Sequence, residues 1–273
     1  MHHCKAARTR KHLQGFTLIE MAMVLVIVGL MMGGIMGALG PQLDNKKVRD
    51  TQERIKQASE AIMAFAIANR RLPCPASATS NGDELVGALG LCTNFNGGFV
   101  PARTLGLGER GPNGVTQDAW GFGIRYAVTQ VTYTGLGNLP ISINCSAGCY
   151  PFTQPDGIKN AYYFNGVPTT QPSVASLLQV CASSTGVTAT TCGVAPANLV
   201  VQPAFVVWST ARNGAELPGG SGPDEAVNLN LNPVYVTHPR TEPGATGGAL
   251  DDILQWQTVA TVLQSMTNMG ILK

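Results

Sequence analysis

The sequence predicts an α+β fold in which one long N-terminal helix packs on a β-rich, disulfide-stabilised globular head. Three features predict this fold: residues 16–71 join an apolar run to a helical periodicity, the body after residue 76 is rich in turn formers, and six of the seven cysteines lie beyond residue 73. The 273 residues are 44% apolar and 12% charged, with 32 Gly and 17 Pro. This composition indicates an ordered core with many turns.

The first fifteen residues form a basic leader. They contain no acid and four basic residues, Lys5, Arg8, Arg10 and Lys11, which leaves 14 of the 18 basic residues against 16 acidic ones in the rest of the chain. Because the body lacks a dense Lys/Arg patch, we expect no nucleic-acid partner. Of the four histidines only His238 lies beyond the leader, so the body lacks the residues for a histidine-based metal site.

Residues 21–39 are nineteen residues without a charge. At about 1.5 Å per residue, a helix of this length nearly matches the ~30 Å hydrocarbon core of a bilayer. The run is too long for the apolar part of a usual secretory signal peptide, and residues 40–42 make a poor cleavage site, so we expect a retained transmembrane segment. Basic residues flank both ends of the run, so charge alone leaves its orientation open.

Small residues recur inside this run. Gly29, Gly33 and Gly37 are spaced four residues apart, which favours close helix packing, with lipid-facing flexibility as the alternative. Glycines 33 and 34 together with Pro41 predict a kink or local melting between residues 33 and 41.

Glu20 is the only charged residue between residues 16 and 43, and it lies at the start of the apolar run. An unpaired carboxylate in lipid is costly, so an acid at this place indicates a function. The alternative is that Glu20 lies at the depth of the lipid headgroups.

The residues around Glu20 form a motif. The stretch KHLQGFTLIE, residues 11–20, followed by the apolar run, resembles the class III signal of type IV prepilins and type II secretion pseudopilins. The resemblance implies cleavage after Gly15 by a membrane prepilin peptidase on the cytoplasmic side and N-methylation of Phe16. It also implies that Glu20 pairs with the amine of a neighbouring subunit, which neutralises both charges in lipid.

Three segments follow from these patterns: a leader at 1–15, a transmembrane and then amphipathic helix at 16–71, and a β-rich periplasmic or extracellular head at 72–273. The second half of the helix carries an apolar stripe that we expect to face the head, formed by Val48, Thr51, Ile55, Ala58, Ile62 and Phe65. Strands are predicted at 121–133, 158–165, 199–208 and 226–236. Residues 250–266 favour a short helix, although residues 251–256 alone suit a strand.

The body cysteines have neither a CxxC pair nor a set of histidines, so zinc-ligand spacing is missing. We therefore expect disulfides made in an oxidising compartment, with buried free thiols as the alternative. Among several connectivities that the sequence permits, we predict the local pairs Cys74–Cys92 and Cys181–Cys192. This choice leaves Cys145 and Cys149 as a tight loop.

Two fragments of the body, residues 118–121 and 208–220, resemble the major pseudopilin of type II secretion. In that family a calcium-binding loop follows the second fragment. The acids here are few for the roughly six to eight oxygens that calcium takes. We therefore predict a solvated acidic turn and no cofactor, with calcium as the alternative, for the acids Glu216, Asp224, Glu225, Asp251 and Asp252.

The sequence matches known catalytic motifs only weakly. Residues 106–111 fit GxGxxG, but Pro112 follows where a helix should open, and no G-x-S-x-G surrounds a serine that could join His238 and Asp251 in a triad. We expect a protein that is not an enzyme.

The resemblance implies a pilus-like filament subunit, anchored in the inner membrane before assembly. Its partners would be other pilin subunits, prepilin peptidase, an inner-membrane assembly platform and membrane lipid. The head of about 200 residues is longer than those of many major pilins, which favours a minor pilin. The alternatives are a type II secretion pseudopilin, an adhesin or ligand-binding module, and a membrane-tethered enzyme.

Overall fold

The computed structural model describes the chain in eight stretches: residues 15–87, 90–108, 111–130, 152–164, 167–168, 178–193, 197–214 and 222–272. The chain divides into two compact units, the first ending at Lys46 and the second beginning at Lys47. We refer to these as the first unit and the second unit.

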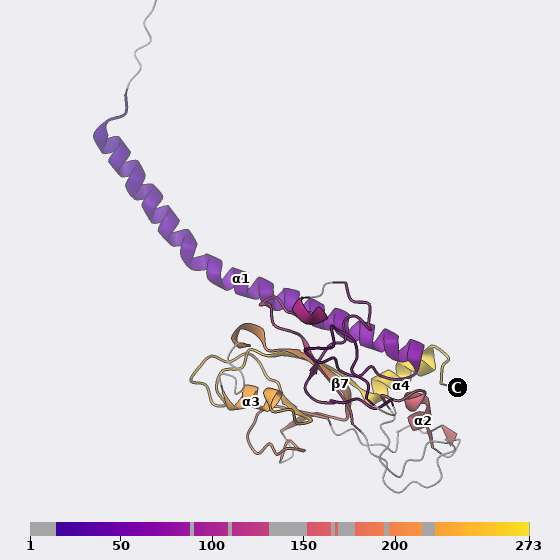
Figure 1. Ribbon diagram of the computed structural model, residues 1–273. Helices are drawn as coiled ribbons and strands as arrows, with labels where there is room; N and C mark the ends of the chain where they lie inside the picture. The colour runs from indigo at the N-terminus through magenta and orange to yellow at the C-terminus, as the bar shows by residue number, and fades with distance from the viewer. Residues whose placement is uncertain are drawn as a thin grey trace, which may run out of the picture. The chain divides into compact units, whose positions relative to one another are not determined.

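Helix α1 (Leu18–Asn69) belongs to both units and contains Pro41 without a break, so the local melting predicted near this proline is not seen. In the second unit the predicted apolar stripe does face the core. Thr51, Ile55 and Ile62 are buried along one side of the helix, whose part in the second unit runs along the head (Figure 1). The helix ends one turn before Pro73, and Arg70 takes a left-handed φ of 56° just past the last helical residue.

The head is built on a four-stranded antiparallel sheet in the order β1-β2-β7-β9. A three-stranded sheet has the order β6-β5-β8, with β5 parallel to β8, and β3 pairs with β4. The strands have these bounds: β1 Gly98–Phe99, β2 Arg125–Val128, β3 Tyr163–Phe164, β4 Val167–Pro168, β5 Gln179–Cys181, β6 Asn198–Val201, β7 Pro203–Ser209, β8 Val234–Val236 and β9 Ile253–Thr258.

Short helices complete the second unit. These are α2 (Gly157–Tyr162), α3 (Pro223–Leu229), α4 (Val259–Asn268) and two 3-10 turns at Pro112–Gly114 and Ala211–Asn213. Three strand predictions therefore need correction. Residues 157–162 form α2, residues 226–229 belong to α3, and the predicted strand at 199–208 is divided at Gln202, whose φ is 65°.

The layers of the second unit follow from its core clusters. Alternate residues along β2 and just before it, Ile124, Tyr126 and Val128, join Phe205 in one cluster with residues of α1 and α4. The opposite face of the same sheet, represented by Trp208, packs on β5 and β8. The three-stranded sheet then packs on α3 and the Cys181–Cys192 disulfide. Helices thus cover one side of the larger sheet and the smaller sheet covers the other (Figure 1).

Both predicted local disulfides are present, Cys74–Cys92 and Cys181–Cys192. Their sequence separations of 18 and 11 residues keep each within one loop. The predicted Cys145–Cys149 pair lies outside the described residues.

Side-chain contacts attach α1 to the head at two places. Near Lys47, Arg54 Nη1 donates to the carbonyl of Gln117 at 2.7 Å, and Thr51 Oγ1 accepts from the amide of Ala119 at 3.0 Å. Just past the other end of the helix, Arg71 forms two hydrogen bonds of 2.8 and 2.6 Å with the Glu84 carboxylate. These hydrogen bonds hold residues 117–119 against α1 and hold the Cys74–Cys92 loop against the segment just past its end.

Candidate functional site

The start of α1 carries the residues that the sequence indicates for processing and assembly. Residues 15–17 precede the helix, and the Phe16 side chain is 81% exposed. Glu20 closes a capping box with Thr17: the carboxylate oxygen Oε2 accepts from the Thr17 amide and from the Thr17 hydroxyl, each at 3.2 Å. The Glu20 amide in turn donates to Thr17 Oγ1 at 3.3 Å.

The helix after this box presents apolar side chains on all sides. Exposed residues include Leu18, Ile19, Met21, Met23, Val24, Leu25, Val26, Ile27, Val28, Leu30, Met31 and Met32. A surface of this kind indicates a binding partner or a lipid environment.

Of the three spaced glycines, Gly29 faces open space, because a Cβ added there would meet nothing within 4 Å beyond its own stretch of helix. The surroundings of Gly33 and Gly37 lie outside the described residues, and their packing role stays a prediction. Among the described residues, no helix meets the length and apolar character that a membrane crossing requires.

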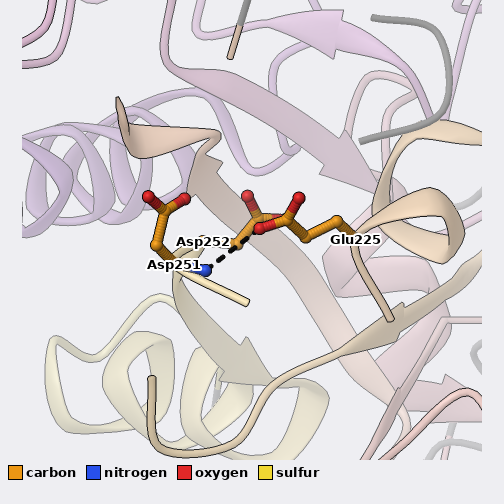
Figure 2. A group of neighbouring side chains, drawn as sticks. All are labelled: Glu225, Asp251 and Asp252. Carbon is orange, nitrogen blue, oxygen red and sulfur yellow. Dashed lines mark hydrogen bonds between the residues drawn. The ribbon is translucent and has the colours of Figure 1, made fainter. Parts of the chain in front are cut away.

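A second group of chemically distinctive side chains lies in the head. Glu225 is in the first turn of α3, and Asp251 and Asp252 directly precede β9. One carboxylate oxygen of each lies within 4.8 Å of the others, and we call these three residues the acidic cluster (Figure 2).

Amide groups hold the acidic cluster in place. Asn213 Nδ2 lies 2.7 Å from both carboxylate oxygens of Glu225, and the Asp251 amide donates to Glu225 Oε1 at 3.1 Å. Asn228 Nδ2 donates to Asp252 Oδ2 at 2.7 Å. Asp251 Oδ1 is buried and has no hydrogen-bond partner among the described residues.

The cluster changes the protonation of its members. Burial raises the pKa of Asp252 from 3.8 to about 8, against the hydrogen bond from Asn228, and the neighbouring acids raise it further. Burial and then the charge of Glu225 raise the pKa of Asp251 from 3.8 to about 6, against nearby arginines. In both residues burial is the largest cause, and the neighbouring acids add to it.

These findings correct the prediction of a solvated acidic turn. Asp224 and Glu225 are each 1% exposed and Asp252 is 9% exposed, while Glu216 lies outside the described residues. Three carboxylates, of which Asp251 Oδ1 is buried without a hydrogen-bond partner among the described residues, form a donor set of the hard type that calcium prefers, so the acidic cluster comprises the residues that could hold such a cation.

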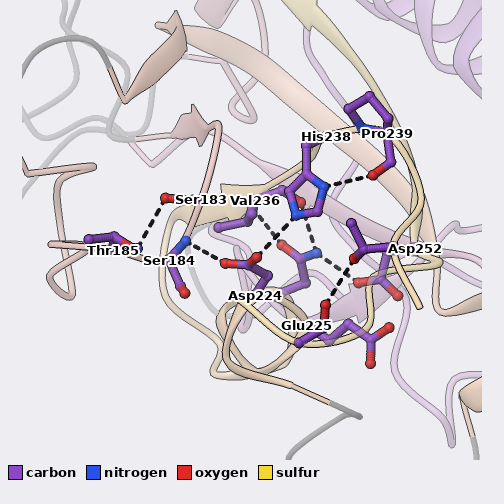
Figure 3. Close-up of polar contacts among 12 residues, drawn as sticks. Ser183, Ser184, Thr185, Asp224, Glu225, Val236, His238, Pro239 and Asp252 are labelled. Atoms are coloured by element: carbon purple, nitrogen blue, oxygen red, sulfur yellow. Dashed lines mark hydrogen bonds and ion pairs between the residues drawn. The ribbon is translucent and has the colours of Figure 1, made fainter. Parts of the chain in front are cut away.

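His238 does not join Asp251 in a catalytic arrangement. Its Nε2 lies 3.0 Å from Asp224 Oδ2 and its Nδ1 lies 2.7 Å from the carbonyl of Pro239, so each ring nitrogen already faces an oxygen (Figure 3). The other oxygen of Asp224 accepts from the Ser184 amide at 2.6 Å. Asp224 lies in α3 and therefore links this helix to the Cys181–Cys192 loop through Ser184 and to the segment after β8 through His238.

A cavity of about 250 Å³ lies beside the acidic cluster within the second unit. Asp251 and Asp252 line it together with Trp120, His238 and Arg240. The cavity places both aspartates next to space that water or an ion can enter.

Several residues of these sites are not identified by the sequence patterns. Thr17 is one, although the spacing of a threonine and a glutamate three residues apart before an apolar run is a capping-box signature. Asn213 and Asn228 carry no comparable signal, because their partners come from other segments of the chain.

Comparison with known proteins gives a match at the N-terminal site. No curated protein and no solved structure matches the chain. Residues 10–36 match the family model of the prokaryotic N-terminal methylation motif, a range that includes Gly15, Phe16, Glu20 and the exposed apolar turns that follow. Such a motif implies cleavage by a prepilin peptidase and assembly with other pilin subunits. The chain therefore carries, in residues 10–36, the class III prepilin signal of type IV pilin-like proteins.

Proposed function

We propose that this protein is a structural subunit, specifically a minor pilin, of a type IV pilus-like filament. Prepilin peptidase cleaves it after Gly15, Phe16 is methylated, and the N-terminal helix enters the filament. Before assembly the helix crosses the inner membrane once and the head lies in the periplasm. The head has a structural role in the filament and no catalytic one.

The observation that carries this proposal is the methylation motif of residues 10–36, continued by the exposed apolar turns of α1. In water this surface would be unfavourable by roughly 25 cal/mol for each Å² of apolar area. Lipid and then the helices of neighbouring subunits are the two surroundings that remove this cost. A filament subunit passes from the first to the second.

The disulfides support the proposed location of the head. Cys74–Cys92 and Cys181–Cys192 need an oxidising compartment, which the periplasm and cell surface provide and the cytoplasm does not. The length of the predicted head, about 200 residues, supports a minor pilin over a major one. A type II secretion pseudopilin is the alternative within the same class of machinery.

Substitution of Glu20 tests the assembly role. Glu20→Val and Glu20→Gln remove the charge that neutralises a neighbour's amine, while insertion and cleavage stay as in the parent or improve. We expect both variants to be processed and yet absent from sheared filaments, measured in cells without the parent subunit. Glu60→Gln, an exposed change in the same helix, is the control. Filament incorporation of Glu20→Val at the parent level would contradict the pairing.

Affinity purification from crosslinked envelopes separates the two kinds of machinery. A minor pilin is recovered with pilus subunits and a pseudopilin with outer-membrane secretion components. Saturable surface binding by the head without either set of partners would favour an adhesin.

A further inference from the structure

The cavity of about 250 Å³ in the second unit has charges of both signs in its lining. Asp251 and Asp252, just before β9, are the acidic members, and Arg240, which follows β8, is a basic one. Trp120 and Ile253 add aromatic and apolar surface. Ligand sites combine apolar walls with a few polar groups in this way, and the volume suits a molecule smaller than a drug-sized ligand.

Asp251 supplies an acceptor that no described residue uses, because its Oδ1 is buried without a hydrogen-bond partner. The torsion that turns an aspartate carboxylate is soft, so a small rotation brings Oδ1 to a donor in the cavity. The neighbouring Asp252 receives one bond, from Asn228. Two carboxyl groups favour a donor that carries positive charge, and a primary ammonium has three N–H donors and no acceptor.

Basic side chains surround these acids. Both Arg240 and Arg212 attract the charge of Asp251. Lys47 Nζ lies 6.0 Å from the centroid of the Trp120 ring, which lines the cavity. A ligand with positive charge alone would be repelled by these cations, whereas one with an anion a few atoms from its ammonium is attracted at both ends. Phosphate suits the anionic end, because its oxygens can accept bonds from more than one basic side chain.

His238 lines the cavity too, but its ring is already engaged. The two ring nitrogens face oxygens of Asp224 and Pro239 (Figure 3). Recognition of charge therefore falls to the acids and the arginines. Val48 and Leu254 supply apolar atoms for the short carbon chain that joins the two charges of the ligand.

We propose that the cavity binds a phosphoethanolamine group, in which two carbon atoms separate a primary ammonium from a phosphate. The ammonium donates to the Asp251 carboxylate and lies by the Trp120 ring, and the phosphate accepts from Arg240 and Arg212. Such a group occurs in the head of a membrane lipid and as a free phosphate ester. The inference goes beyond the proposed function, because the lining belongs to the second unit and binding does not require a filament.

Calorimetric titration of the full chain in maltoside detergent tests the ligand, with a calcium chelator present throughout. Phosphoethanolamine should bind saturably, with a Kd below about 1 mM. Ethanolamine, inorganic phosphate and phosphocholine should each bind at least about tenfold more weakly, because each lacks one end or the N–H donors. Phosphate that binds as well as phosphoethanolamine would reduce the cavity to a simple anion site and overturn the inference, as would no saturable binding by phosphoethanolamine.

Two substitutions test which side chain meets each end of the ligand. Asp251→Asn removes the charge that meets the ammonium, and Arg240→Gln removes a donor to the phosphate, so each should weaken binding about tenfold. Asp83→Asn and Arg103→Gln alter an exposed ion pair elsewhere in the head and should bind as the parent does. Parent affinity in both Asp251→Asn and Arg240→Gln would show that the ligand does not bind in this cavity.

Inorganic phosphate separates lost recognition from a disturbed fold. Asp251→Asn should bind phosphate as well as the parent or better, since the acid that repels phosphate is neutralised, while Arg240→Gln should bind it more weakly. Loss of both phosphate and phosphoethanolamine in Asp251→Asn would show that the acid only supports the cavity, and would overturn its role.

Nanodiscs distinguish the two sources of the group, with the proposed membrane helix inserted. If the lipid head reaches the cavity, phosphatidylethanolamine in the bilayer competes, and free phosphoethanolamine binds more weakly than in phosphatidylcholine nanodiscs. If the free ester is the ligand, its affinity is the same in both bilayers, and either result upholds the site. Filament incorporation of Asp251→Asn at the parent level, together with lost binding, leaves the proposed function in place.

Discussion

At the scale of single residues, Glu20 and Asp252 can be compared, because each is a carboxylate that accepts hydrogen bonds from a neighbouring side chain. Asp252 is buried, where an unpaired charge is unfavourable, and the same would hold for Glu20 in the proposed membrane location. Glu20 receives two hydrogen bonds from Thr17, both at Oε2. Asp252 receives one donor from Asn228, lies beside two other acids, and holds its proton to about pH 8 as its pKa indicates.

Processing is the first prediction at this scale. Intact-mass measurement of the membrane-extracted protein should show residues 1–15 absent and one methyl group on the amine of Phe16. Because a small residue must fit the peptidase, Gly15→Ala should be cleaved more completely than Gly15→Leu. A chain that still begins at Met1, in cells with a working prepilin peptidase, would contradict the assignment of the motif.

A second prediction concerns pH. The pKa of Asp252 is raised in the folded state from 3.8 to about 8, so its contribution to stability is full below pH 3.8 and is lost as pH rises toward 8. With a chelator present, the free energy of unfolding should fall between these limits by about 1.4 kcal/mol per pH unit for this one group. Denaturant unfolding at a series of pH values measures it.

Asp252→Asn tests the source of that slope. Asparagine keeps an oxygen for the Asn228 amide and cannot ionise, so the slope should become shallower, with the part due to Asp251 remaining. Asp83→Asn changes an exposed acid and should leave the slope unchanged. An equal slope in Asp252→Asn and the parent would show that Asp252 does not titrate in this range.

At the scale of elements, α1 is well predicted because its signal is local. The three- and four-residue spacing of Ile55, Ala58 and Ile62 puts them on one face whatever the rest of the chain does, and all three are buried. The sequence predicts the helix at 16–71, and the structure has it at Leu18–Asn69. The helix ends at Asn69, where Arg70 takes a left-handed conformation, and Pro73 follows within the next turn.

Elements whose form depends on partners are predicted less well. Residues 250–266 favour a helix from their apolar spacing, yet Ile253–Thr258 form β9 because β7 pairs with them along their length. Helix α4 begins only at Val259, where the Thr258 side chain caps the Thr261 amide. Tertiary pairing here overrides an ambiguous local pattern.

The buried face of α1 gives a prediction for this scale. Ile62→Ala should lower the free energy of unfolding by about 2–5 kcal/mol, because it opens a cavity where Ile62 is fully buried between helix and sheet. Lys56→Ala, on the exposed side of the same helix, should change it by about 0.5 kcal/mol or less. Chemical denaturation of both variants measures the difference.

The disulfides give another prediction at the scale of elements. Replacing both Cys181 and Cys192 by serine should cost about 2–5 kcal/mol, because the loop that carries Ser184 to Asp224 is no longer closed. Peptide mapping without reductant should recover the Cys181–Cys192 and Cys74–Cys92 links from the parent. Free thiols at these four positions in protein from the native envelope would be incompatible with the structure.

At the scale of the whole molecule, the head site depends on long-range contacts that no local pattern reveals. Glu225 and Asp251 are 26 residues apart and meet because α3 and the start of β9 are brought together by the two sheets. The sequence indicates which acids are present without predicting their burial. The N-terminal site, in contrast, lies within six consecutive residues, 15–20, and its motif identifies it directly.

The division at Lys46 makes a prediction about the whole chain. A fragment of residues 47–273 should fold with the same thermal midpoint as the full chain in detergent, because the three core clusters contain no described residue before Ile55. A fragment of residues 60–273 should unfold at a lower temperature, since it lacks Ile55 and Ala58. Near-UV circular dichroism follows both transitions. Failure of the longer fragment to fold would place part of its core in the first unit.

The two attachment points of α1 to the head also decide how the molecule carries mechanical load. Thr51 and Arg54 form hydrogen bonds with residues 117–119 near Lys47. At the other end, just past the last residue of α1, Arg71 forms hydrogen bonds with Glu84. A force along the helix axis therefore acts at the same time on both sets of hydrogen bonds and on the buried contacts between them. Shear of this kind requires many contacts to break together, whereas a pull across the axis would open them one after another.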